Sequence, residues 1–99
     1  MLRDRKAAFI DLTSGSVRVM PIPEELRLRF LGGRGIDMYL LYNLVGPGVD
    51  PLGPDNVLLV SAGLLTGTPA PAAARTHVAA KSPLTGLLGS SNMGGFFGP

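Results

Sequence analysis

The stretch LLTGTPAPAAARTHVAAKSPLTG, residues 64–86, decides the fold of this chain. It holds a strand pattern over residues 74–81, between two copies of the triplet Leu-Thr-Gly at residues 65–67 and 84–86. Glycine and proline on both sides predict turns at the ends of this strand. From Asn56 to Pro99, Arg75 and Lys81 are the only formally charged side chains. Soluble domains seldom leave so long a stretch with so few charges unless its surface is buried against another molecule or more chain. Because the two charged residues are cations with no acid nearby, we expect that what covers this surface includes an anion.

Alternation along the predicted strand puts Arg75, His77 and Lys81 on one side. Arg75 and Lys81 are then about 20 Å apart, too far for one phosphate but suited to the two ends of an extended anionic ligand. A solvent-facing strand with two surface cations explains the same pattern, and the residues leave both interpretations open. We expect His77 to be a packed or surface residue rather than a metal ligand or a base, because there is no second histidine and no nearby acid in the sequence.

The amino-acid composition is that of a folded globular domain and excludes several other classes of protein. Ninety-nine residues make one small domain or a part of a larger one. With 45% hydrophobic and 16% charged residues the chain is not of the disordered type, and a net charge of +2 does not indicate nucleic-acid binding. The absence of cysteine excludes disulfides and a cysteine-held iron–sulfur cluster within these residues. No signal-peptide core follows the basic start, and the apolar run over 57–65 is too short to span a bilayer, so we expect a cytoplasmic protein with no membrane partner.

Local patterns predict the elements in order. Strands are expected at 7–12 and 16–22, joined by a hairpin loop with Gly15 at positive φ. A short helix at 24–31 would carry an apolar stripe of Leu26, Phe30 and Leu31, and a second helix at about 36–44 should be largely buried. Residues 46–54 predict a rigid connection, and Asp50 and Asp55, which bracket its last prolines, are expected to form turns. Residues 57–62 predict a strand covered on both faces, and 86–90 a last strand. The predicted fold class is α+β, mainly antiparallel β-sheet with two short helices.

Two glycine-rich segments could approach a ligand. Residues 32–35, GGRG, could present backbone N–H groups to an anion at the start of the second helix, but a helix end followed by a tight turn explains them equally well. In Asn92-Met93-Gly94-Gly95 the adjacent glycines would allow close approach of a ligand, or simply form a turn. No paired carboxylates and no nucleophile–base pair are visible in the sequence.

Taken in series, five motifs resemble the N-terminal domain of the aldehyde ferredoxin oxidoreductases. They are GGRG at 32–35, VDPLGPDN at 49–56, LTGTPAP at 65–71, KSPLTG at 81–86 and SNMGGFFG at 91–98. The resemblance covers nearly the whole chain. It implies that residues 1–99 are an incomplete, truncated portion of a pterin-cradling β domain, in a family whose members are several times longer.

The resemblance also implies an activity. The family oxidises aldehydes to carboxylic acids with tungsten, sometimes molybdenum, held by two pterins (molybdopterin) whose phosphates are bridged by magnesium. Electrons pass through a [4Fe–4S] cluster to ferredoxin. The cluster and the acid–base residues belong to later domains, so this chain alone is expected to be inactive and to hold no catalytic residue. A homo-oligomer is compatible with the resemblance.

Cofactor-binding positions carry over by motif. Arg75 matches the arginine between pterin and cluster, and Asn92 matches the asparagine whose backbone carbonyl helps to hold the magnesium. Gly94 and Gly95 would let the backbone approach the cofactor, and Lys81 would compensate charge or serve the structure. The chain departs from the family in having Ala73-Ala74 before the arginine, Thr76 after it and Met93 after the asparagine, which affects the fine geometry of the site. The alternative to an enzyme portion is a non-catalytic pterin- or phosphate-binding module that requires partner subunits.

Overall fold

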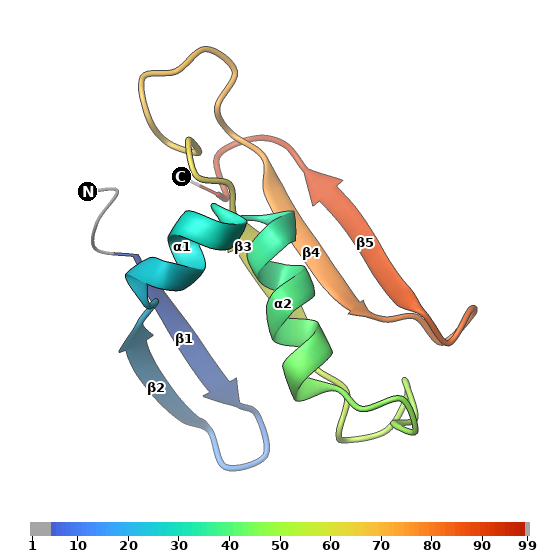
Figure 1. The fold of residues 1–99 in the computed structure, drawn as a ribbon. Coiled ribbons are helices and arrows are strands. Elements are labelled where there is room, and N and C mark those ends of the chain that lie inside the picture. The colour runs from blue at the N-terminus through green and yellow to red at the C-terminus, as the bar shows by residue number, and fades with distance from the viewer. Residues whose placement is uncertain (1–4, 99) are drawn as a thin grey trace.

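The computed structural model of the chain describes residues 5–98 (Figure 1). In chain order its elements are β1 (Lys6–Asp11), β2 (Ser16–Pro21), α1 (Glu24–Phe30), α2 (Arg34–Leu44), β3 (Leu59–Ala62), β4 (Thr76–Lys81) and β5 (Leu88–Met93). β1 and β2 form an antiparallel pair, while the second sheet has the order β3-β4-β5 with antiparallel neighbours throughout. The predicted fold class, α+β with mainly antiparallel strands and two short helices, is confirmed.

The loop between β1 and β2 contains the turn residues that the sequence predicts. Gly15 has φ of 71°, as expected for this loop, and the Asp11 carboxylate accepts a hydrogen bond of 3.0 Å from the Thr13 N–H. The hairpin is tied to the rest of the chain at its start, where the Arg5 guanidinium donates to the Leu64 carbonyl. This contact joins the two sheets through the loop that follows β3.

A tight corner connects α1 to α2. A Cβ on Gly35 would lie 2.4 Å from the Phe30 carbonyl oxygen, and one on Gly32 would lie 3.1 Å from the Leu64 nitrogen. Gly33 has φ of 55°. A side chain at Gly35 would collide with neighbouring backbone, one at Gly32 would be unusually close to it, and one at Gly33 would strain the left-handed conformation. The corner is tighter than expected, so that α2 begins at Arg34 rather than at residue 36.

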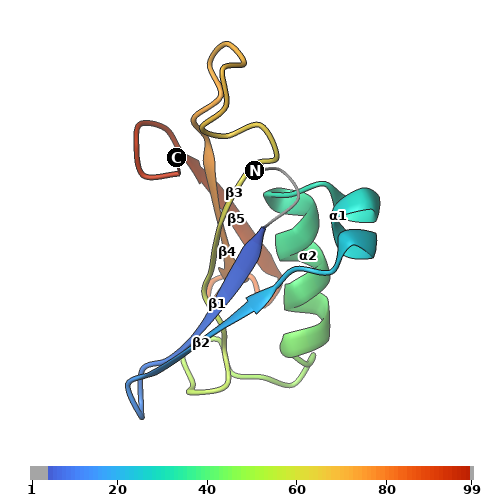
Figure 2. The same cartoon turned by 90° about the vertical axis from the view of Figure 1, so that its left-hand side faces the viewer.

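The helices lie on one side of the three-stranded sheet (Figure 2). α2 packs on β3 and β4, and the small core contains Ile36, Leu41 and Ala79. The prediction that α2 is largely buried was wrong, since Tyr42 and Leu44 are exposed. The sheet covers only the helical stripe that faces it, because a helix packed on one layer leaves its opposite side open.

Two further burial predictions were wrong. β3 was expected to be covered on both faces, but it is a four-residue strand at the edge of the sheet. Val60 within the strand and Leu58 just before it are both exposed. The helices cover only one face of this sheet, and β3 has a neighbouring strand, β4, on only one of its two edges. Leu31, directly after α1, is exposed, whereas Phe30 at the end of the helix is half-buried and its ring centroid lies 4.9 Å from that of Tyr39. None of the helices in residues 5–98 is both long and apolar enough to cross a bilayer.

Candidate functional site

One end of the three-stranded sheet gathers four of the predicted site residues. Thr76, the first residue of β4, pairs with Met93 at the end of β5, so the adjacent Arg75 and Gly94 come to the same end of the sheet. Asn92 pairs with His77 one step along the ladder. The antiparallel register of β4 and β5 therefore brings Arg75, Asn92, Gly94 and Gly95 together from two segments of the chain.

Arg75 combines a fixed backbone with an available side chain. Its carbonyl accepts a hydrogen bond of 3.0 Å from Thr66 Oγ1, and the loop that leads to it is closed by a 2.8 Å bond from the Gly67 N–H to the Ala73 carbonyl. The guanidinium is exposed and makes no hydrogen bond or ion pair with any other residue in 5–98. A positioned cation of this kind suits an anionic or strongly hydrogen-bonding group.

The glycines beside Arg75 leave the backbone accessible. A Cβ at Gly94 or Gly95 would meet no atom of the described chain within 4 Å, and Gly95 has φ of +96°. Three residues later the chain folds back, because a Cβ on Gly98 would lie 2.5 Å from Thr76 Oγ1. An exposed cation next to open, side-chain-free backbone fits the phosphate or pterin group that the sequence predicts here.

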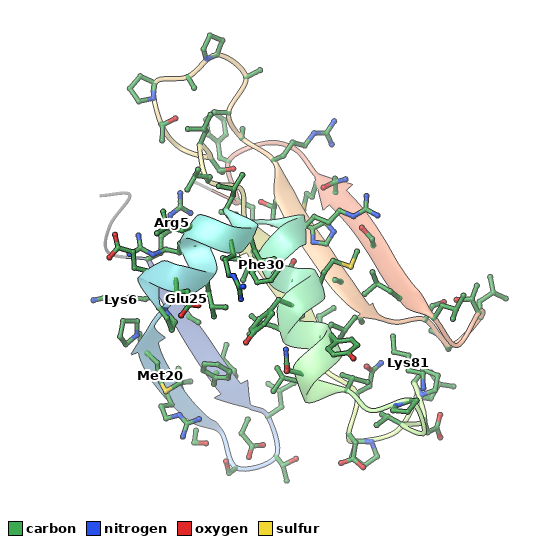
Figure 3. All side chains as sticks on the ribbon, in the orientation of Figure 1. Arg5, Lys6, Met20, Glu25, Phe30 and Lys81 are labelled. Carbon is green, nitrogen blue, oxygen red and sulfur yellow. The ribbon has the colours of Figure 1, made fainter. Side chains whose placement is uncertain are left out.

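Lys81 lies at the opposite end of β4, where it pairs with Leu88 (Figure 3). Its Nζ donates to the carbonyl oxygens of Pro47 and Val49, at 3.0 and 2.7 Å. The Asn56 side chain reaches the backbone of the same residue, with its amide 3.1 Å from the Lys81 carbonyl. Lys81 thus holds the loop after α2 against the sheet. The predicted contact between Lys81 and a cofactor stays a prediction. The contacts observed for Lys81 are those of the structural role, which the sequence had left open.

A buried polar network surrounds His77, which is 4% exposed, and Asp37, which is 2% exposed. His77 Nδ1 lies 2.6 Å from Asp37 Oδ2, and His77 Nε2 lies 2.7 Å from Ser90 Oγ. Ser61 Oγ donates to the same Asp37 oxygen at 2.8 Å. The network joins α2 to all three strands of the sheet.

The expectation that no acid lies near His77 was wrong, because α2 folds back over β4 and brings in a residue 40 positions away. A signal was present in the sequence: Asp37 is the one acid in an otherwise apolar helix pattern. A buried charge requires a partner, and His77, the single histidine of the sequence, was the matching candidate.

The other sequence alternatives are resolved by backbone contacts. Gly33 is buried and its N–H donates to the Ala62 carbonyl at 3.1 Å, so this N–H is not presented to an anion, and Gly32 and Gly33 form the turn that precedes α2. Asp50 accepts from the Leu52 N–H at 3.0 Å, which confirms it as a turn-former.

A separate open groove of about 910 Å³ lies between the hairpin and β3. Its lining includes Phe9, Ile22, Leu40 and Val57 and is mainly apolar. Among residues 5–98 no three His, Asp or Glu side chains gather closely enough to hold a metal ion, in the groove or elsewhere. Charged residues also line the groove, among them Arg5, Arg18 and Arg27.

Comparisons with known proteins identify the family to which the chain is related. Residues 7–99 match the family model described as aldehyde ferredoxin oxidoreductase, N-terminal domain. The chain is 47% identical over 89 residues to the tungsten-containing aldehyde ferredoxin oxidoreductase of Pyrococcus furiosus and 46% identical to that of Thermococcus kodakarensis, with 90% of this chain and 15% of each relative covered. The solved structure of the active site complex BamBC of benzoyl coenzyme A reductase with 1,5-dienoyl-CoA superposes with a TM-score of 0.88 at 41% identity, covering 93% of this chain and 14% of that chain.

The fold and these matches place the chain in a family of oxidoreductases. The chain belongs to the aldehyde ferredoxin oxidoreductase family, in which it corresponds to the N-terminal domain. It spans about 15% of the length of the curated relatives that it matches.

Proposed function

We propose that this chain forms part of one wall of a site for tungsten or molybdenum held by two pterins. The enzyme to which it contributes oxidises aldehydes to carboxylic acids and passes electrons through a [4Fe–4S] cluster to ferredoxin. The observation that carries the proposal is the Arg75 guanidinium, exposed and unpaired with other described residues, beside the open backbone of Gly94 and Gly95. Membership of a family with tungsten-containing relatives supports the choice of cofactor.

Each residue at this end of the sheet has a distinct role in the proposal. Arg75 donates charge-assisted hydrogen bonds to pterin or phosphate groups and stabilises their negative charge. The Asn92 carbonyl helps to bind magnesium, for which oxygen ligands are preferred. Gly94 and Gly95 allow the cofactor to approach the backbone. The bound metal supplies the redox chemistry, while these residues bind, orient and balance charge.

The remainder of the proposed activity lies outside these residues. The sequence has no cysteine, so the ligands of the [4Fe–4S] cluster come from elsewhere in the enzyme. The names of the relatives support an aldehyde as substrate and ferredoxin as electron acceptor, and a cytoplasmic location is part of the proposal.

A second candidate is a non-catalytic pterin- or phosphate-binding module that works only with partner subunits. The exposed Arg75 beside the open backbone of Gly94 and Gly95 would serve this function as well. Metal analysis separates the two functions, because a purified protein that retains tungsten and pterin without any partner contradicts the module.

The test of the binding site is the affinity of the chain for a phosphorylated pterin, measured by fluorescence. Arg75→Ala should weaken binding roughly tenfold or more, because a hydrogen bond to a charged group contributes about 1.5–3 kcal/mol. Arg29→Ala removes another exposed arginine, on α1, and should leave the affinity unchanged. If Arg75→Ala binds as tightly as the unmodified chain, the proposed site is wrong.

A further inference from the structure

The groove between the hairpin and the three-stranded sheet is bounded by two strand edges. Every residue of β1 and every residue of β3 contributes to its lining. Neighbouring residues of a strand point to opposite faces, so a lining that includes all of them runs along the edge of each strand rather than over one face. The lining also includes Ile36, Leu40 and Leu44 of α2, which give the groove an apolar floor. The groove is therefore a slot between two strands, with a helix beneath it.

The outer edge of β3 presents main-chain groups that β4 does not use. The Ala62 carbonyl accepts its 3.1 Å hydrogen bond from the Gly33 N–H, so it points away from β4. Main-chain groups alternate in direction along an antiparallel strand, and Val60 therefore points its N–H and C=O the same way. Leu59 and Ser61 are the residues that bond to β4. Val60 thus offers one donor and one acceptor to the groove.

The free edge of β1 has the same character. The Ile22 N–H donates to the Arg5 carbonyl at 2.9 Å, which places this pair in the ladder with β2. Bonded pairs recur at every second residue, so Phe9 also bonds to β2, whereas the N–H and C=O of Ala8 face away from it. β1 and β3 are not paired with each other, and no main-chain group of residues 5–98 bonds to Val60 or Ala8 on the groove side. Two unpaired edges therefore border one groove.

The groove has room for one strand. A strand takes up about 3.3 Å per residue along its axis, about 4.8 Å between neighbours and about 10 Å between layers, or roughly 160 Å³ per residue. The volume of about 910 Å³ corresponds to about six residues, and β1 itself has 6. The hairpin stands before the edge of β3 in every copy of the chain, which hinders direct pairing of β3 with β3 of a second copy. A single extended strand is the occupant that fits.

The charges around the groove indicate the chemistry of that strand. Cations outnumber acids in the lining, which contains Arg5, Lys6, Arg18, Arg27, Asp11 and Asp37. Both carboxylates already have partners inside the chain, Asp37 in the network with His77 and Asp11 at the Thr13 N–H. Arg18 is exposed, and its guanidinium carbon lies 5.6 Å from the centroid of the Phe9 ring. An acid near Arg18 complements this charge, and apolar side chains match the floor formed by α2.

We propose that the groove receives one extended strand from the part of the enzyme outside these residues, with apolar side chains toward α2 and a carboxylate near Arg18. The strand bonds to β1 along one edge and to β3 along the other, and so joins the two sheets into one. The length of the relatives supports this source, because the chain spans about 15% of each. The inference rests on the proposed function, in which the chain is one wall of a larger enzyme.

A synthetic peptide tests the groove on the full 99-residue chain. The probe has about six residues, the usual length of a strand, with alternating valine and threonine, one glutamate and blocked ends. NMR follows the exchange of each backbone amide with solvent. We expect the amides of Val60 and Ala8 to exchange at least about tenfold more slowly in the complex, because the peptide bonds to both edges. The amides of Leu59 and Phe9, which already belong to ladders, should change much less.

Variants at the two contact points separate strand pairing from unspecific apolar binding. Val60→Pro removes the outward N–H and should weaken peptide binding about fivefold or more. Because β4 does not use this N–H, the variant should keep its fold, as checked by circular dichroism. Val60→Thr keeps both the N–H and a β-branched side chain and should bind like the unmodified chain. Arg18→Ala should weaken binding of the glutamate peptide by up to about fivefold and leave that of the corresponding glutamine peptide unchanged.

Each outcome bears on a different part of the inference. A lack of peptide binding by the unmodified chain, or equal binding by Val60→Pro and Val60→Thr, overturns the groove as a strand site. Protection of the Val60 amide that rises with protein concentration, without peptide, assigns the edge to a second copy and also overturns it. In the complete enzyme β3 should be protected without added peptide, and exchange as fast as in the 99-residue chain overturns the proposed source.

The cofactor site is tested independently of the groove. Arg75 does not line the groove, so every one of these failures leaves the weaker pterin binding of Arg75→Ala as expected. An unchanged pterin affinity in Arg75→Ala, by contrast, overturns the proposed cofactor site without affecting peptide binding.

Discussion

Removal of the Asp37 carboxylate should be among the most damaging single changes in this chain. Its Oδ2 accepts hydrogen bonds from Ser61 Oγ at 2.8 Å and from His77 Nδ1 at 2.6 Å. In Asp37→Ala both donors are left without this acceptor in the interior, at about 1–3 kcal/mol each. Their sum, about 2–6 kcal/mol, overlaps the roughly 3–5 kcal/mol typical of breaking a buried ion pair. A domain of this size has a total stability of about 5–15 kcal/mol, so the variant should lose a large share of it.

Urea unfolding of the full chain, followed by circular dichroism, measures the loss as a lower midpoint. Asp37→Asn keeps an oxygen that can accept both hydrogen bonds but removes the charge, so it should lose about half as much free energy as Asp37→Ala. Asp55→Ala removes an exposed carboxylate of the proline loop and should change stability by no more than about 0.5 kcal/mol. If Asp37→Ala unfolds within about 1 kcal/mol of the unmodified chain, with an unchanged slope, the network does not stabilise the fold as reasoned.

Two other changes have outcomes that follow from local contacts. Gly35→Ala should lower the free energy of unfolding by more than about 2 kcal/mol, because its Cβ would lie 2.4 Å from a backbone oxygen. Gly94→Ala is the matched control: its Cβ meets nothing within 4 Å, so its free energy of unfolding should stay within about 1 kcal/mol of that of the unmodified chain. Equal midpoints for the two variants in thermal unfolding would contradict the close packing at the helix corner. Lys81→Met removes two hydrogen bonds to loop carbonyls and should speed amide exchange over residues 46–56, with a loss of about 1–2 kcal/mol. Unchanged exchange in that loop would show that Lys81 does not hold it.

Local chemistry made much of the fold predictable. The hairpin follows from Gly15 between two short strands, and the first helix starts after Pro23 with Glu24 and Glu25 in its first turn. The cofactor-binding candidates at 75 and 92–95 came from motifs whose order along the chain is specific. Burial was harder to predict, because an apolar residue such as Val60 gives the same sequence pattern in an exposed edge strand as in a strand covered on both faces.

The sequence by itself determined the types of the elements, their order and the family, because propensities, turn residues and motif spacing are properties of neighbouring positions. Only the tertiary structure decided which residues meet. The β4–β5 register brought Arg75 to the backbone of Gly94, and the packing of α2 on β4 paired Asp37 with His77. Such contacts depend on how far-separated segments close on one another, and no local preference of the chain encodes a hydrogen bond across 40 residues.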